Sequence, residues 1–268
     1  MNTAAPAPVL FIPHGGGPRP LLEDPEHRSL TEFLRSIGQA YAKPEAILVV
    51  SAHWEAPQPT LLGQARPELY YDYYNFPPES YQLSYPADNP PALQQQVLSA
   101  LRQQGIAVET DANRGYDHGV FVPLLLMQPE ADLPVLQLSL TQNLDPAKHI
   151  ELGRALASLR AQGVMILGSG LSFHNMQAFR GGSNSNGAES VAFHDWLVES
   201  LTDADLSAEQ RFDRLAHWQQ APMARYCHPR EEHLLPLHVC LGAAEGAAAE
   251  IVFDEPVLGH RAIGALWR

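Results

Sequence analysis

The chain has 268 residues and a formal net charge of -13 at pH 7, with 45% hydrophobic and 18% charged residues. This composition is typical of a globular protein and excludes a collagen-like or disordered chain. The acidic balance opposes binding to nucleic acid or to an anionic membrane surface, because both attract clustered lysine and arginine. No stretch reaches the roughly 18 to 20 uninterrupted apolar residues of a membrane span. We therefore expect neither a nucleic-acid nor a membrane partner.

Short apolar runs alternate along the chain with segments of helical spacing. The runs that fit buried strands lie at 9–12, 46–52, 134–140, 164–170 and 250–253, with weaker candidates at 106–109 and 262–267. Helices are predicted around 29–41, 90–104, 146–161, 188–201, 208–217 and 231–242. The alternation predicts an α/β fold, a single domain over residues 1–268 with a central mixed β-sheet flanked by helices on both faces.

Two segments do not fit this alternation. Residues 68–91 combine many aromatic side chains with prolines, which predicts an ordered irregular excursion rather than a pair of strands. Residues 179–190 form a turn-rich loop that leads into a helix, with Ser185 or Asn186 as its cap. Either segment is placed to overhang a pocket.

Three of the twelve histidines follow predicted strands. His14 ends the first strand, His53 ends "ILVVSAHW", and His174 follows "VMILGSGLSFHN". Open α/β sheets bind ligands at the carboxyl ends of their strands. A single histidine at such a position is more often a hydrogen-bonding loop residue, but three at equivalent positions favour a site. The glycines at 15–17 allow a sharp turn and a close approach to a ligand.

Two further histidines have partners in sequence that suit chemistry. His118 lies in "GYDHGVFVPLL" just before a predicted buried helix, where a structural and a functional role are equally supported. His233 follows Glu231 and Glu232, whose carboxylates suit the first turn of a helix but could instead complete a metal site. His228 could line the pocket. Five of the remaining histidines fit packing or surface positions: His27, His149, His194, His217 and His238.

The number of cysteines and the N-terminal segment indicate the cellular compartment. Cys227 and Cys240 are too few for a disulfide framework. The segment "MNTAAPAPVLF" lacks the positive region and the long apolar stretch of a secretory signal. We therefore expect a cytoplasmic protein.

The motifs together resemble a known family. In order and approximate spacing, "HGGGP", "SAHW", "DHGVFVPL", "GSGLSFHN" and "EEHLLPL" resemble the class III extradiol ring-cleavage dioxygenases of the LigB type, and most of all their DOPA 4,5-dioxygenase branch. The resemblance runs from about residue 9 to at least 240 and includes the aromatic segment. In two places the chain departs from it: three glycines follow the first histidine where many members have Gly-His-Gly-Ser-Pro, and Phe121 stands where tryptophan is common.

The resemblance implies a LigB-like fold and a mononuclear non-haem Fe(II) centre that binds a catechol through its two oxygens and O2 at an adjacent open position. By matching motifs, His14 and His53 would be ligands, and His233 or the neighbouring Glu232 would complete the set. His174 would be a fourth ligand or an acid/base. Zn(II) is expected to occupy the site in purified protein in some cases, because divalent affinities favour Zn over Fe.

The same resemblance assigns proton transfer and substrate contacts. His118 would take a proton as the catechol binds and return it during ring opening. In the aromatic segment, Tyr71, Tyr74 and Phe76 would pack against the substrate ring, although an ordinary core contact is equally consistent with each. The partners implied are a small catechol and O2, with a homo-oligomer as an open possibility.

Two rival functions are consistent with the same residues. Three histidines and a water-activating group also describe zinc hydrolases. Against this class, the chain has no H-E-x-x-H helix. The second rival is a non-enzymatic, metal-binding partner protein similar to Memo, because a fold can keep its site after its function has changed.

Overall fold

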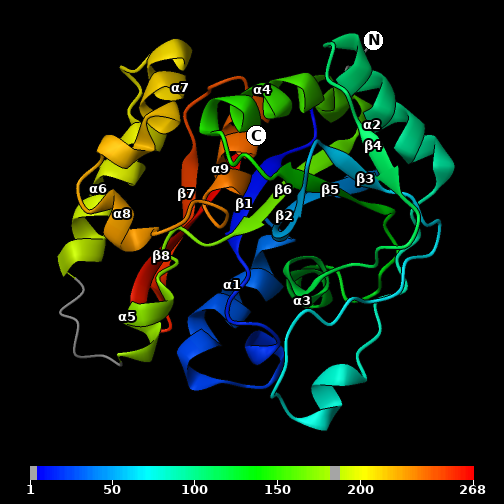
Figure 1. The fold of residues 1–268 in the computed structure, drawn as a ribbon, viewed down its shortest axis with the longest axis horizontal. Helices are drawn as coiled ribbons and strands as arrows, with labels where there is room; N and C mark the ends of the chain where they lie inside the picture. Colours follow the sequence, from blue (N-terminus) through cyan, green and yellow to red (C-terminus); the bar gives the residue numbers. More distant parts are fainter. Residues whose placement is uncertain (1–4, 182–187) are drawn as a thin grey trace.

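The structure, a computed structural model, describes residues 5–181 and 188–268 and is built on one eight-stranded sheet (Figure 1). The strand order is β4-β3-β5-β2-β6-β1-β8-β7. The strands are β1 (Val9–Pro13), β2 (Ala46–Ala56), β3 (Thr60–Leu62), β4 (Glu109–Asp111), β5 (Val135–Thr141), β6 (Val164–Gly170), β7 (Glu250–Val257) and β8 (His260–Trp267).

The centre of the sheet is parallel and its margins are mixed. Strands β5, β2, β6 and β1 run parallel, whereas β8 pairs antiparallel with β1 and β7, and β3 pairs antiparallel with β5. Every residue of β1 and β6 is buried, as expected for parallel strands covered on both faces. This burial explains the continuous apolar runs in the sequence, and the parallel order brings the carboxyl ends of these strands to one edge.

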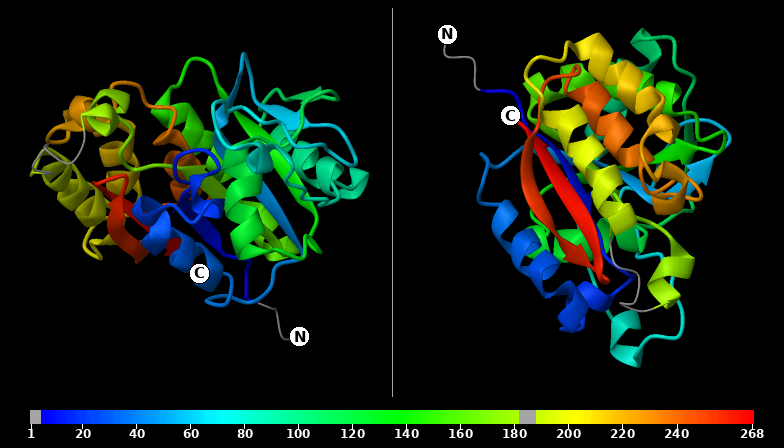
Figure 2. Two further views of the ribbon diagram at one scale, coloured as in Figure 1. Left: turned by 90° about the horizontal axis from the view of Figure 1, so that it is seen from below. Right: turned by 90° about the vertical axis from the view of Figure 1, so that its left-hand side faces the viewer.

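Helices cover both faces of the sheet. Helices α1 and α3 pack together on one face, and α4 and α9 pack together on the other (Figure 2). The predicted α/β class with a central mixed sheet is therefore confirmed. The helices of the described chain are α1 (Arg28–Ile37), α2 (Pro91–Gln103), α3 (His118–Met127), α4 (Pro146–Leu156), α5 (Met176–Arg180), α6 (Ala188–Thr202), α7 (Ala208–Ala216), α8 (Ala224–Cys227) and α9 (Leu235–Ala243).

The differences from the predicted elements are local. Helix α9 begins at Leu235 rather than at 231, with Pro236 in its first turn, where proline is favoured because its missing N–H leaves no bond unmade. The strand expected at 106–109 starts only at Glu109. Strand β3 and helices α5 and α8 are too short to show a period in sequence.

The two irregular segments have different outcomes. Residues 68–90 are irregular as predicted, apart from a 3-10 turn at Pro78–Tyr81 and an isolated bridge between Leu69 and Tyr116, and Pro91 already begins α2. The suggested caps Ser185 and Asn186 lie outside the described residues. Among the helices of the described ranges, none has the length and apolar character to cross a membrane.

Two histidines that lie away from the carboxyl edge of the sheet are buried in the core, and hydrogen bonds fix each of them in one tautomer. His149 donates from Nδ1 to the Asp145 carbonyl at 2.7 Å and accepts at Nε2 from the Thr141 N–H at 3.2 Å. His194 donates from Nδ1 to the Ser190 carbonyl at 2.6 Å. Burial lowers the pKa of both histidines to about 4. Both rings are therefore neutral in the folded protein at pH 7.

This burial makes stability depend on pH in a defined direction. As the pH falls below about 6.5, the unfolded chain protonates these histidines while the folded chain does not, so the free energy of unfolding decreases. As the pH falls from roughly 6 to roughly 4, each ring lowers the free energy of unfolding by about 1.4 kcal/mol per pH unit. Above about pH 7 it has no such effect. Urea denaturation should give a flatter pH profile for His149→Gln than for the wild type. Parallel profiles would contradict the assignment.

Candidate active site

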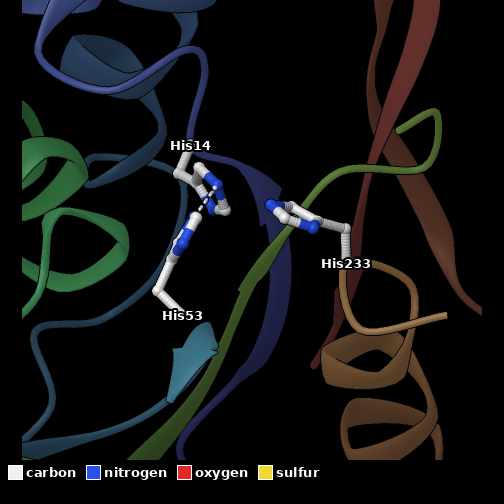
Figure 3. Close-up of side chains that lie close together, drawn as sticks. All are labelled: His14, His53 and His233. Carbon is white, nitrogen blue, oxygen red and sulfur yellow. Dashed lines mark hydrogen bonds between the residues drawn. The ribbon is translucent and has the colours of Figure 1, made fainter. Parts of the chain in front are cut away.

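Three histidines that are far apart in sequence point toward one another at the carboxyl edge of the sheet (Figure 3). His14 follows β1, His53 lies near the end of β2, and His233 lies in the turn before α9. The Nε2 atoms of His14 and His53 are 3.0 Å apart. The ring centroid of His233 is 5.3 Å from that of His14 and 4.9 Å from that of His53.

The glycine run holds a tight turn beside His14. Gly15 has a φ of +82°, and a Cβ there would lie 2.7 Å from Pro20 Cγ and 2.8 Å from His27 Cδ2. The next residue, Gly16, donates its N–H to His27 Nε2 at 3.0 Å. Position 15 therefore requires glycine, because the left-handed backbone and the close packing both exclude a side chain there. His27, expected to be an ordinary packing residue, supports this turn.

In two of the three rings, the Nδ1 atom, which faces away from the cluster, makes a hydrogen bond. His14 donates from Nδ1 to Ser169 Oγ at 3.1 Å, since the Ser169 hydroxyl itself donates to the Gly119 carbonyl. His233 donates from Nδ1 to Glu232 Oε1 at 2.9 Å. With a proton fixed on Nδ1, the lone pair of each ring is on Nε2. Metal-binding histidines are commonly oriented in this way.

Burial keeps the three rings neutral. Burial, reinforced by the neighbouring histidines, holds the pKa of His14 and His53 well below the ordinary value. Burial and the nearby His174 lower the pKa of His233 to about 4. Two neutral imidazoles whose Nε2 atoms lie 3.0 Å apart need a shared proton or a cation between them. Three neutral nitrogen donors suit Fe, Zn and related divalent ions, so the donor set fits a metal.

A carboxylate from the irregular segment connects His53 with His118. Asp72 Oδ1 accepts from His118 Nδ1 at 2.7 Å and from the His118 backbone N–H at 3.0 Å. Its other oxygen, Oδ2, is 3.6 Å from His53 Nδ1, and the two histidine rings are 3.8 Å apart between centroids. Asp72 was not among the predicted site residues. The signal that could have found it is a single carboxylate within the aromatic run "YYDYYNF".

His174 lies behind His233 rather than in the group of three. The two rings stack with their centroids 3.4 Å apart, and His174 Nδ1 is 3.2 Å from Glu232 Oε1. Burial alone would raise the pKa of Glu232, but hydrogen bonds from His174 and His233 hold it below its usual range. Glu232 is thus a carboxylate that contacts the Nδ1 side of both rings, whereas His233 contributes to the central cluster.

A cavity of about 430 Å³ opens above the cluster, and its wall includes His14, His53, His118, His174 and His233. The five histidines singled out from the sequence are thus brought together on one cavity. His228 is not on its wall: it is buried and its Nε2 donates to the Ser172 carbonyl at 2.9 Å.

The predicted substrate contacts are only partly consistent with this cavity. Phe76 lines it, and so does Tyr73, which was not predicted. Tyr74 is 79% exposed and is not on the wall. Tyr71 faces a different hollow, and its hydroxyl donates to the Leu83 carbonyl at 2.8 Å. In this structure the irregular backbone turns Tyr73, rather than Tyr71 or Tyr74, toward the cavity.

One glycine sets the position of His233. At Gly170, the last residue of β6, an added Cβ would overlap the His233 carbonyl oxygen. The adjacent Leu171 N–H donates to that same oxygen at 3.0 Å. We expect Gly170→Ala to displace His233 and to weaken metal binding about 10- to 100-fold, as measured by titration with a divalent metal. Gly181→Ala is the control, because among the described residues the nearest atom to its Cβ would lie at an ordinary 3.5 Å. Equal affinity in both variants would contradict the role of Gly170.

A histidine cluster at the carboxyl edge of an α/β sheet is the arrangement expected of a metal-dependent α/β enzyme. Comparison with known families is more specific. Residues 4–265 match the family described as the catalytic LigB subunit of aromatic ring-opening dioxygenase. The chain belongs to this family. It is therefore a metal-dependent oxygenase of the extradiol, ring-opening type, which acts on a small aromatic molecule and O2.

Individual relatives cover most of the chain. It is 42% identical over 255 residues to "Dioxygenase tasH" of Hapsidospora irregularis, which covers 89% of this chain and 78% of the relative. It is 38% identical over 250 residues to "4,5-DOPA dioxygenase extradiol" of Beta vulgaris, with 92% and 90% covered. A crystal structure of an uncharacterized Escherichia coli K12 protein superposes with a TM-score of 0.78 at 28% identity, over 98% of this chain and 100% of that one.

Proposed function

We propose that residues 1–268 form a single catalytic domain that uses Fe(II) and O2 to open the ring of a catechol-type, DOPA-like substrate. The observation that carries this proposal is the convergence of three neutral imidazoles, with Nε2 of His14 and His53 3.0 Å apart, on the cavity of about 430 Å³. Several relatives bear the name 4,5-DOPA dioxygenase extradiol, which supports the choice of substrate.

His14, His53 and His233 are the proposed metal ligands. When bound, Fe(II) would supply coordination positions for the two catechol oxygens and for O2. The protein contributes three uncharged donors, and the ring orientations of two of them, His14 and His233, are set in advance by Ser169 and Glu232. His174 is assigned to proton transfer, because it lines the cavity and stacks on His233 but lies outside the group of three.

His118 is the proposed acid/base. Its Nδ1 proton is held by Asp72 at 2.7 Å, so Nε2 is the ring nitrogen that can accept a proton from a catechol hydroxyl and later return it. Tyr73 and Phe76 provide aromatic faces on the cavity wall, which suit a flat ring. Together these residues bind, orient and deprotonate the substrate.

The test is a turnover assay with defined metal content. The protein is loaded anaerobically with Fe(II) and then mixed in air with DOPA, caffeate or protocatechuate. We expect O2 consumption matched by a yellow ring-opened product for at least one catechol, and none from the same protein loaded with Zn(II). Ester or amide hydrolysis by the Zn(II) form, without O2 consumption by the Fe(II) form, would favour a hydrolase instead. Metal binding without any turnover would favour a binding protein.

A further inference from the structure

The mouth of the cavity carries charged side chains that the proposed chemistry does not use. Besides the histidines, the charged residues on the wall are Arg19, Glu26 and Arg180. Arg19 is neutralised locally: its Nη1 is 3.0 Å from Asp24 Oδ2 and 3.7 Å from Glu26 Oε2. The pairing leaves one charged residue on the wall to be explained.

Arg180 is that residue. It is the last residue of α5, is exposed, and makes no ion pair with any residue in the described ranges 5–181 and 188–268. A guanidinium offers a planar fork of donors that matches a carboxylate.

Two other residues of α5 place apolar surface beside Arg180. Met176, which is 51% exposed, and Phe179 line the mouth beside Arg180. This surface suits a short hydrocarbon arm that ends in an anionic group. Because the whole chain carries a net charge of -13, an anion is repelled at long range and needs a local cation to be retained.

We propose that Arg180 is a specificity-determining residue that binds a carboxylate on the ring substituent of the substrate. This inference rests on the proposed function, which places the two catechol oxygens at His14, His53 and His233 on the cavity floor. A substituent on the opposite side of the ring then extends away from these histidines toward solvent, and Arg180 is an exposed residue of the cavity wall. The preferred substrates are thus catechols with a short acidic side chain, rather than neutral catechols of the same size.

The test uses two catechols that differ only in charge: 3-(3,4-dihydroxyphenyl)propionate and its primary amide. The Fe(II) enzyme should show kcat/KM for the acid about tenfold above that for the amide. Arg180→Gln should remove this preference by lowering kcat/KM for the acid only, and Arg180→Lys should restore part of it. The preference should also shrink as salt is added, because the side chain is exposed.

Arg66→Gln is the matched control. It removes the same charge from an exposed site outside this cavity, so it should leave the preference for the acid unchanged. An equal preference in wild type and Arg180→Gln, or no preference in the wild type, would overturn the proposal.

Binding measurements separate this proposal from the proposed function. Calorimetric titration of Zn(II)-loaded protein with the acid and the amide gives the same comparison without turnover. If the Fe(II) enzyme opens neither ring and none of DOPA, caffeate and protocatechuate, the proposed function fails, yet a tighter binding of the acid that Arg180→Gln abolishes would still support the carboxylate site. If the rings are opened but binding does not distinguish acid from amide, the assignment of Arg180 is wrong.

Discussion

The His233→Ala variant is expected to lose metal binding by at least about 100-fold and to lose turnover with it. His233 contributes one of three neutral nitrogen donors, and its ring centroid lies 5.3 Å and 4.9 Å from those of His14 and His53. Without this ring the cluster has only two donors, and no carboxylate among the described residues shares the group of three. Titration of metal-free protein with Fe(II) or Zn(II) measures the effect.

The Glu232→Gln variant tests whether Glu232 is itself a metal ligand or only orients the ligand His233. Because Glu232 contacts the Nδ1 atoms of His174 and His233, its replacement should weaken metal binding only about 10- to 100-fold. His217→Ala, at an exposed position on the surface, is the control and should bind metal like the wild type. Tight binding by His233→Ala together with loss of binding by Glu232→Gln would instead make the carboxylate the third ligand.

The central strands could be predicted because their burial requires continuous apolar runs, which are visible in the sequence. Strands β1 and β6 are buried on both faces, and such strands appear as unbroken apolar runs. Elements of three to five residues, such as β3 and α5, contain too few residues to show a period. Their positions are decided by tertiary contacts instead, as in the pairing of β3 with β5 through Leu61 and Leu138.

The site could be predicted where sheet topology determines a residue's place. His14 follows β1 and His53 lies near the end of β2, and these strands belong to the parallel centre of the sheet, so their meeting at one edge is a consequence of strand order. The place of Asp72 depends on the path of an irregular segment, for which no periodic rule exists. The same limit applies to Tyr73 and Tyr74, which the sequence does not distinguish. Their neighbouring positions differ in burial, with 79% of Tyr74 exposed and 8% of Tyr73.

Replacing Asp72 by asparagine is expected to lower kcat about 100-fold or more, with little change in metal content when metal is saturating. The carboxylate accepts two hydrogen bonds from His118, at 2.7 Å from the ring and 3.0 Å from the backbone. Asparagine keeps the size but removes the charge that stabilises a protonated imidazole. It also offers an amide donor, which favours the wrong ring tautomer. The variant is assayed with the best catechol and Fe(II).

A double-mutant comparison shows whether Asp72 acts through His118. His118→Ala should lower kcat at least as much as Asp72→Asn while retaining metal, because His118 lies outside the group formed by His14, His53 and His233. If the two residues work as a unit, the double variant should be no slower than His118→Ala alone. Multiplicative losses would show that Asp72 acts elsewhere, and its 3.6 Å approach to His53 Nδ1 would then be the contact that matters.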